Sequence, residues 1–147
     1  MKFRRILCGV DFSKPSVFAF DAAVELARLL KAELHILHSI EAYPVVPEWS
    51  SAHDFDEAET ALEEKATAAM EALVSTATRA LNGTAITTEV TRGRAFVEIL
   101  NRAREREVDL IVLGAKGLTL LEEAFSGSTA ERVMKGATCS VLIVRGG

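Results

Sequence analysis

The chain has 147 residues, 49% of them hydrophobic and 26% charged, with a formal net charge of −4. This length suits one domain with a single sizeable core, here residues 1–147, and the lack of a clustered basic stretch argues against a nucleic-acid partner. No apolar run approaches the roughly 18 residues that span a bilayer and no signal-peptide core follows the N-terminus, so we expect a cytoplasmic protein with no membrane partner.

The first predicted unit is a strand, a helix and a second strand. The apolar stretch RRILCGVD, residues 4–11, is typical of a buried strand and ends in the carboxylate of Asp11. Ser13 is the expected N-cap of a helix that continues to about Lys31. Residues 33–40 form the second strand. The expected inner stripe of the helix consists of Val17, Phe20, Val24, Ala27 and Leu30.

The region after the second strand combines a loop and a long helix. Glu41 to Phe55 shows neither helical nor strand periodicity and is predicted to be a loop. Its Tyr43 and Trp49 either cover a ligand or pack the loop onto the body, and packing is the favoured alternative. A helix beginning at Asp54 or Asp56 is predicted to run to about Leu81, because this stretch is rich in Ala, Glu and Lys. Its expected packing stripe consists of Leu62, Ala66, Ala69, Leu73 and Ala77.

The second half of the chain continues the alternation. Residues 85–90 predict a strand near a sheet edge, and a helix over 95–107 follows Gly93. A buried strand over 110–113, a helix over 130–135 and a closing strand over 139–144 complete the chain. Five strands alternating with four helices predict an α/β fold with a doubly wound parallel sheet.

The stretch from Val108 to Thr129, VDLIVLGAKGLTLLEEAFSGST, carries the strongest functional signal. Gly114 ends a strand, Gly117 follows, and Gly127-Ser128-Thr129 leads into a helix. Glycines allow close backbone approach to a ligand, and a helix N-terminus offers N–H groups to an anion. We interpret this stretch as a phosphate cradle for a nucleotide. The alternative is an ordinary strand–loop–helix connection that binds nothing.

If the strand order is 3-2-1-4-5, the first and fourth strands flank the switch point where ligands bind. Asp11 would then face Gly114, and its carboxylate would accept two hydrogen bonds from ribose hydroxyls. The alternative role for Asp11 is that of a turn or cap residue. Lys116 either reaches a phosphate or is solvated. Glu122 and Glu123 either hold a divalent ion, with Mg²⁺ the candidate, or face solvent, which is favoured.

These residues resemble the universal stress protein family over essentially the whole chain. The resemblance rests on RRILCGVDFS, on HSI at the end of the second strand, on DLIVLGAKG followed by nine residues and GST, and on the final VLIV. The spacing of Gly114, Gly117 and Gly127-Ser128 is similar to that of nucleotide-binding members. The family implies the 3-2-1-4-5 sheet of an adenine-nucleotide alpha-hydrolase-like fold, a bound ATP, AMP or ADP, and dimers paired through the last strand, Val141–Val144.

The same resemblance assigns roles to individual positions. It implies that Asp11 holds the ribose or base. The backbone around Gly9, Val10 and Ser39 would line the adenine, and Leu113 and Gly114 would line the ribose. The phosphates would be held by Gly117, Gly127, Ser128 and Thr129. Ala130 lacks a hydroxyl that many members carry.

Three functions are compared on these observations. The first is a homodimeric regulatory stress protein that binds ATP or AMP, with at most slow hydrolysis, because no catalytic triad and no metal-ligand spacing is present. His35 and His38 are expected to be packed or hydrogen-bonded. The second is a dimeric interaction module of the same fold without a nucleotide. The third, ranked last, is an enzyme that activates a substrate with ATP.

Overall fold

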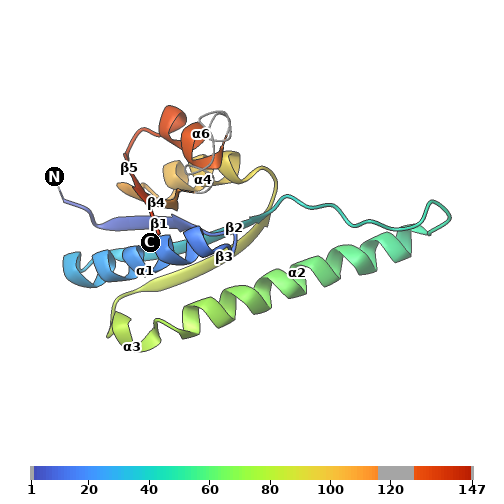
Figure 1. The fold of residues 1–147 in the computed structure, drawn as a ribbon, viewed down its shortest axis with the longest axis horizontal. Helices are drawn as coiled ribbons and strands as arrows, with labels where there is room; N and C mark the ends of the chain where they lie inside the picture. Colours follow the sequence, from blue (N-terminus) through green and yellow to red (C-terminus); the bar gives the residue numbers. More distant parts are fainter. Residues whose placement is uncertain (1, 116–127, 147) are drawn as a thin grey trace.

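The computed structural model describes residues 2–115 and 128–146 (Figure 1). Five parallel strands form one sheet in the order β3-β2-β1-β4-β5, which confirms the predicted topology. The strands are β1 (Arg5–Gly9), β2 (Glu33–Ile40), β3 (Ile86–Arg92), β4 (Leu110–Gly114) and β5 (Ser140–Val144). Sequence order reverses between β1 and β4, so a switch point lies there, as predicted.

Helices cover both faces of the sheet (Figure 1). The helices are α1 (Lys14–Leu30), α2 (Ala52–Ser75), α3 (Thr78–Leu81), α4 (Ala95–Glu105) and α6 (Thr129–Gly136). Successive strand residues face opposite sides, so Ile6 and Cys8 join the core beneath α1, whereas Leu7 joins the core beneath α4 and α6. None of the helices in the described ranges has the length and apolar character needed to cross a bilayer.

The buried face of α1 differs from the predicted stripe at its end. Phe20, Val24 and Ala27 are buried as predicted, but Leu30 is exposed. Leu30 is the last residue of the helix, because Lys31 adopts the left-handed conformation (φ 55°) of a C-cap and turns the chain into β2. The last apolar residue of the helical pattern therefore lies beyond the core.

Helix α2 begins earlier than predicted, so the last four residues of the expected loop are helical. Ser51 and Asp54 form a capping box: the Asp54 backbone N–H donates to Ser51 Oγ at 3.2 Å, and the Ser51 N–H donates to the Asp54 carboxylate at 3.0 Å. These two bonds satisfy N–H groups that the helix cannot satisfy internally. The helix consequently begins at Ala52 rather than at Asp54 or Asp56.

The other end of α2 also departs from the prediction of one helix to Leu81. The hydroxyls of Ser75 and Thr76 donate to the carbonyls of Ala72 and Leu73, each at 2.7 Å. Such side-chain bonds compete with the backbone pattern of a helix. The helix ends at Ser75, and the short α3 follows as a separate turn.

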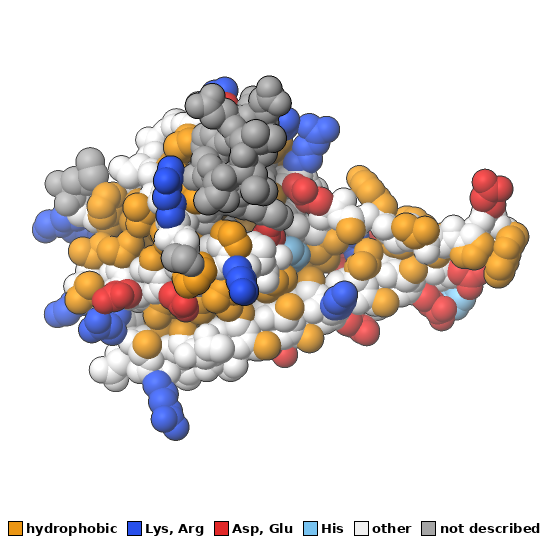
Figure 2. Space-filling view, in the orientation of Figure 1, with side chains coloured by type: hydrophobic (Ala, Val, Ile, Leu, Met, Phe, Trp, Pro, Cys, Tyr) orange, Lys and Arg blue, Asp and Glu red, His pale blue; other side chains and the backbone are white. Residues whose placement is uncertain are grey.

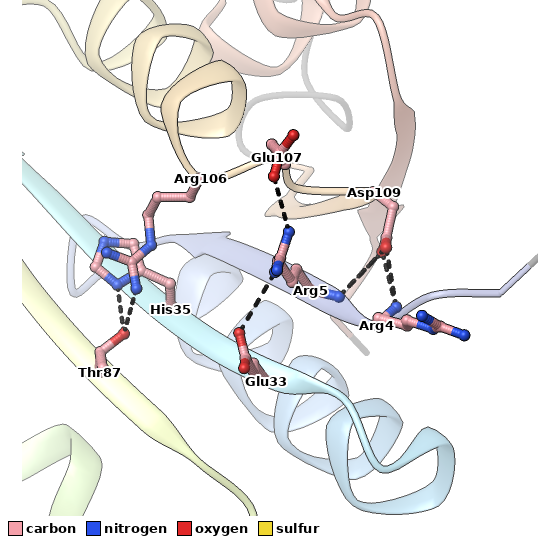
Figure 3. Close-up of polar contacts among 8 residues, drawn as sticks. All are labelled: Arg4, Arg5, Glu33, His35, Thr87, Arg106, Glu107 and Asp109. Atoms are coloured by element: carbon pink, nitrogen blue, oxygen red, sulfur yellow. Dashed lines mark hydrogen bonds and ion pairs between the residues drawn. The ribbon is translucent and has the colours of Figure 1, made fainter.

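A polar cluster around the buried His35 links β2, β3 and α4. His35 Nδ1 lies 2.7 Å from Thr87 Oγ1, and His35 Nε2 lies 3.0 Å from Glu89 Oε1. Arg102 donates to the other Glu89 oxygen at 2.6 Å. Arg106 donates to Thr87, as Figure 3 shows. Burial lowers the pKa of His35, outweighing the opposite effect of its bond to Glu89. The prediction that His35 is a hydrogen-bonded structural histidine is confirmed.

Candidate functional site

A cavity of about 860 Å³ opens at the carboxyl ends of β1, β2 and β4. Its size falls within the usual range for small-molecule sites, about 300–1,000 Å³. Eight of the predicted binding residues line it: Gly9, Val10, Asp11, Ser39, Leu113, Gly114, Ser128 and Thr129. Lys116, Gly117 and Gly127, together with Glu122 and Glu123, lie outside the described residues.

Asp11 holds the turn that leads from β1 into α1. Its Oδ1 accepts a hydrogen bond from the Ser13 backbone N–H at 3.0 Å and a second one from the Ser13 hydroxyl. The Asp11 N–H donates to Ser16 Oγ at 3.3 Å, which ties the turn to the helix. The turn role that the sequence left open is therefore present. A ribose contact of the Asp11 carboxylate stays a prediction.

Phe12 and His38 brace the same turn from within the cavity lining. Their rings lie 4.6 Å apart between centroids, and His38 Nδ1 lies 2.8 Å from the Val10 carbonyl oxygen. Since a carbonyl only accepts, Nδ1 carries the hydrogen of this contact. Phe12 has a φ of 65°, an unfavourable conformation for a residue with a side chain. The turn is thus held by the ring contact and by the bond from His38 to Val10.

Gly114 is required by packing at the end of β4. A Cβ atom at this position would lie 2.5 Å from the Pro15 carbonyl oxygen and 3.0 Å from the Ser16 nitrogen. Both are backbone atoms, which cannot rotate away as a side chain can. The missing side chain thus lets the first turn of α1 approach β4, and this contact forms one wall of the cavity.

The N-terminus of α6 closes the side of the cavity next to β4. Ser128 is the N-cap, and its Oγ accepts a hydrogen bond from the Glu131 N–H at 3.2 Å. Ser128, Thr129 and Ala130 all line the cavity. The first N–H groups of a helix have no acceptor within the helix, and the helix dipole favours an anion at this end. The predicted helix after Gly127-Ser128-Thr129 is confirmed, and its N-terminus borders the cavity. The phosphate cradle itself stays a prediction.

The sequence reasoning missed the contribution of α2. Leu62, Lys65, Ala66 and Ala69 line the cavity from this helix. Three of them belong to the stripe predicted to pack against the body. Their helical spacing predicted this packing but not that they also line the cavity. Lys65 is the one Lys or Arg among the described lining residues, and its position is not evident from any local motif.

Glu41 is a second lining residue that the sequence did not identify. Its Oε1 accepts a hydrogen bond from the Ala95 N–H at 2.5 Å and so caps α4. Ser39 is similarly engaged, since its hydroxyl donates to the Gly93 carbonyl at 2.6 Å. Both contacts join the end of β2 to the start of α4. Among the residues described, no three His, Cys, Asp or Glu side chains come together as a metal site would need.

Comparison with known proteins identifies relatives along the whole chain. The sequence model of the universal stress protein family matches residues 2–145. Universal stress protein YxiE of Bacillus subtilis is 36% identical over 153 residues, a match that covers 97% of this chain and 99% of that protein. Among solved structures, universal stress protein UspA from Lactobacillus plantarum is 26% identical with a TM-score of 0.78, and the match covers 99% of each chain.

Two further solved structures share the fold and hold nucleotides. One, a universal stress protein in complex with cAMP, has a TM-score of 0.77 at 22% identity, with 99% of this chain and 98% of that chain covered. The other, the universal stress protein from Archaeoglobus fulgidus in complex with dAMP, has a TM-score of 0.65 at 20% identity, with 97% and 98% covered.

Proposed function

The chain belongs to the universal stress protein family, and from this premise we propose that its cavity binds an adenine nucleotide and that the protein acts as a regulatory stress protein. The observation that carries the proposal is the position of the cavity. It lies at the carboxyl ends of β1 and β4, where the strand order reverses, and the N-terminus of α6 borders it.

The lining offers separate surfaces for the parts of a nucleotide. Val10, Leu37 and Leu113 supply apolar contact for a base, and the carboxylate of Asp11 accepts hydrogen bonds from a ribose. The N-terminus of α6, at Ser128 and Thr129, meets the phosphates. Lys116, Gly117 and Gly127 complete the proposed phosphate site on the ground of the sequence. The neighbours that hold cAMP and dAMP support an adenine nucleotide as the ligand.

The same site bears on which adenine nucleotide binds and on whether ATP is hydrolysed. ATP, ADP and AMP are all candidate ligands, and Glu122 and Glu123 are the sequence-based candidates for a Mg²⁺ contact. His38 is the histidine of the described lining, and its Nδ1 is engaged by the Val10 carbonyl. A base that activates water needs a matching partner and geometry. Because the sequence offers neither a catalytic triad nor metal-ligand spacing, we propose a binding protein whose ATP hydrolysis is at most slow.

We also propose that the protein is a cytoplasmic homodimer paired through β5. This strand lies at an edge of the sheet, and its Leu142 is exposed. An exposed apolar edge strand is a liability that pairing with a second copy removes. Light scattering at micromolar concentration tests this point, and a monomeric mass would contradict it.

The decisive test of the binding site places a charge beside the proposed phosphates. Thr129→Glu adds a carboxylate at the first turn of α6, where an acidic residue suits the helix dipole but repels a phosphate. Thr129→Gln is the matched neutral control. We expect AMP and ATP to bind the Glu variant at least about tenfold more weakly than the Gln variant, while adenosine distinguishes the two variants far less.

The outcomes separate the candidate functions. Calorimetry should show saturable binding of AMP or ATP to the unmodified chain and a rise in its melting temperature. Equal affinities of the two Thr129 variants for AMP would mean that α6 does not meet the phosphates. If no adenine compound binds the unmodified chain, the alternative of a dimeric interaction module without nucleotide replaces the proposal.

A further inference from the structure

A long projection leaves the body of the molecule between β2 and α3. We call residues 41–64 the acidic arm. They comprise the segment after β2 and the first half of α2, and Figure 1 shows them extending well beyond the sheet. The outer part of this projection is distant from the cavity and from both sheet edges.

The arm has an unusual charge. It contains eight of the chain's 21 carboxylates and none of its 17 Lys and Arg residues. The formal net charge is therefore −8 over residues 41–64 and +4 over the rest of the chain. Such segregation orients charged partners and favours a basic surface as the one that meets the arm.

The arm also exposes large apolar side chains. Tyr43 is 83% exposed, Val45 99% and Trp49 85%. The expectation that Tyr43 and Trp49 pack the loop onto the body is therefore wrong, and neither residue lines the cavity. Aromatic residues of this kind dominate the energetic centres of protein interfaces. The arm thus combines apolar contact groups with a surrounding negative charge.

The arm is held in a defined conformation. At its outer end the Ser51–Asp54 capping box fixes the start of α2, and the Ser50 N–H donates to the Pro47 carbonyl at 2.9 Å. At its base Arg92 pairs with Glu63 at 2.9 Å and with Glu59 at 3.3 Å. A preorganised surface loses less conformational entropy on binding than a mobile one does.

The opposite end of the molecule has the complementary composition. We call Lys2, Arg4, Arg28, Leu29, Leu30 and Lys31 the basic end. The last turn of α1 brings Arg28 and Lys31 beside Leu29 and Leu30, which are 60% and 45% exposed. In Figures 1 and 2 the light-blue end of α1, with its cluster of basic and apolar side chains, lies at the left, and the arm with its acidic tip projects to the right.

The cations of the basic end are not neutralised by the acids near them. Arg5 pairs with both Glu33 and Glu107, and Asp109 accepts hydrogen bonds from the backbone N–H groups of Arg4 and Arg5. Figure 3 shows the Arg4 side chain pointing away from this network. Within the described part of the chain, no ion pair involves the side chains of Arg4, Arg28 or Lys31.

We propose that the acidic arm of one copy docks on the basic end of a second copy, head to tail. Trp49 and Tyr43 would contact Leu29 and Leu30, and the arm carboxylates would face the basic side chains. Both surfaces belong to the same chain. They carry opposite charges, and both expose apolar side chains. Because the two surfaces differ, the contact is heterologous and extends into rings or chains of copies. It uses neither β5 nor the cavity.

Two variants that each break one surface test this contact. The arm variant carries Glu48→Lys and Trp49→Ser, and the end variant carries Arg28→Glu and Leu29→Ser. Glu71→Lys, an exposed change on α2 outside the arm, is the control for charge alone. Sedimentation velocity over a range of concentrations measures the mean mass at low and at high salt, and circular dichroism verifies that each variant is folded.

The expected result is an increase of mean mass with concentration for the unmodified chain and for Glu71→Lys at low salt, lost at high salt because salt screens exposed charges. Each surface variant alone should lose this increase. An equimolar mixture of the two should regain association, since the mixture contains one intact arm surface and one intact basic end. No salt-sensitive association of the unmodified chain, or a mixture that stays as small as its components, would overturn the proposal and leave a foreign basic protein as the occupant of the arm.

Discussion

The cavity and the acidic arm are built in opposite ways. The cavity is concave and lies at the ends of buried strands, so the residues that shape it, such as Gly114 and Asp11, also hold the fold together. The arm is convex, and its Trp49 and Tyr43 contact mainly solvent. A side chain that packs within the protein contributes to stability, whereas one that faces water contributes only when a partner covers it. Substitutions in the two regions should therefore affect different measurements.

The largest effect on stability is expected from Gly114→Ala. The added Cβ meets the Pro15 backbone at 2.5 Å, so α1 and β4 must separate. We expect a loss of about 1–3 kcal/mol in the free energy of unfolding, measured by urea denaturation. Gly9→Ala is the matched control, because the atoms nearest to its Cβ belong to the side chains of Leu113 and Ile99 and not to the backbone. An equal or greater loss for Gly9→Ala would contradict the backbone contact at Gly114.

The second prediction separates the two roles of Asp11. Asp11→Ala removes both the turn contact and the proposed ribose contact, whereas Ser13→Ala removes only hydroxyl bonding within the turn. We expect Asp11→Ala to weaken adenosine binding about tenfold, equivalent to about 1.4 kcal/mol. Ser13→Ala should change it little. Calorimetric titration with adenosine measures both, and equal affinities would leave Asp11 with its turn role alone.

The third prediction concerns how the free energy of unfolding depends on pH through His35 in the body of the protein. Burial keeps the pKa of His35 below its ordinary value of 6.5 in the folded chain, while the unfolded chain has the ordinary value. The unfolded state consequently takes up the proton first as the pH falls. The free energy of unfolding is therefore not reduced by His35 protonation above pH 6.5. Below pH 6.5 it falls with the pH, by no more than about 1.4 kcal/mol per pH unit.

His35→Gln provides the control for this pH effect because its side chain does not titrate. The free energy of unfolding, measured at successive pH values between neutrality and about pH 5.5, should fall more steeply for the unmodified chain than for His35→Gln. Glu89 also has a lowered pKa: burial alone would raise it, but hydrogen bonds from Arg102 and His35 outweigh that effect. Its own stability contribution is lost only below its ordinary value of 4.5. Parallel pH profiles would show that His35 is not held neutral by the fold.

The smallest effect on stability is expected from Trp49→Ala in the arm. Because this side chain is 85% exposed, its removal should change the free energy of unfolding by no more than about 0.5 kcal/mol. Adenine nucleotide affinity should also stay unchanged. Urea denaturation and calorimetry measure the two quantities. A loss comparable to that of Gly114→Ala would mean that Trp49 packs against the body, and the contrast between the two regions would fail.

The same contrast explains what the sequence could predict. Buried strands have continuous apolar runs, so β2 and β4 were located nearly to the residue. The alternation of strands and helices predicted a parallel sheet, whereas the strand order came from the resemblance to the universal stress protein family. The Gly127-Ser128-Thr129 motif correctly placed the start of α6 at the cavity. Local patterns of this kind are sufficient to locate an element when its own residues determine whether it is buried.

The predictions were wrong or incomplete where the position of a side chain depends on residues that are distant in the sequence. Whether Trp49 packs depends on the direction of the arm, which no pattern in residues 41–55 encodes. The contribution of Lys65 and Leu62 to the cavity depends on how α2 crosses the end of the sheet. Leu30 fits the helical pattern of α1, yet the helix ends at that residue and leaves it exposed. Periodicity predicts which face of a helix is apolar but not which part of that face is covered.

The cavity between β1, β4 and α6 is proposed to hold an adenine nucleotide. A crystal structure of the chain grown with excess AMP would show whether it does. We expect one AMP molecule per chain, with the ribose at Asp11 and the phosphate at the N-terminus of α6. A cavity filled by the protein's own side chains, or AMP bound elsewhere on the surface, would contradict it.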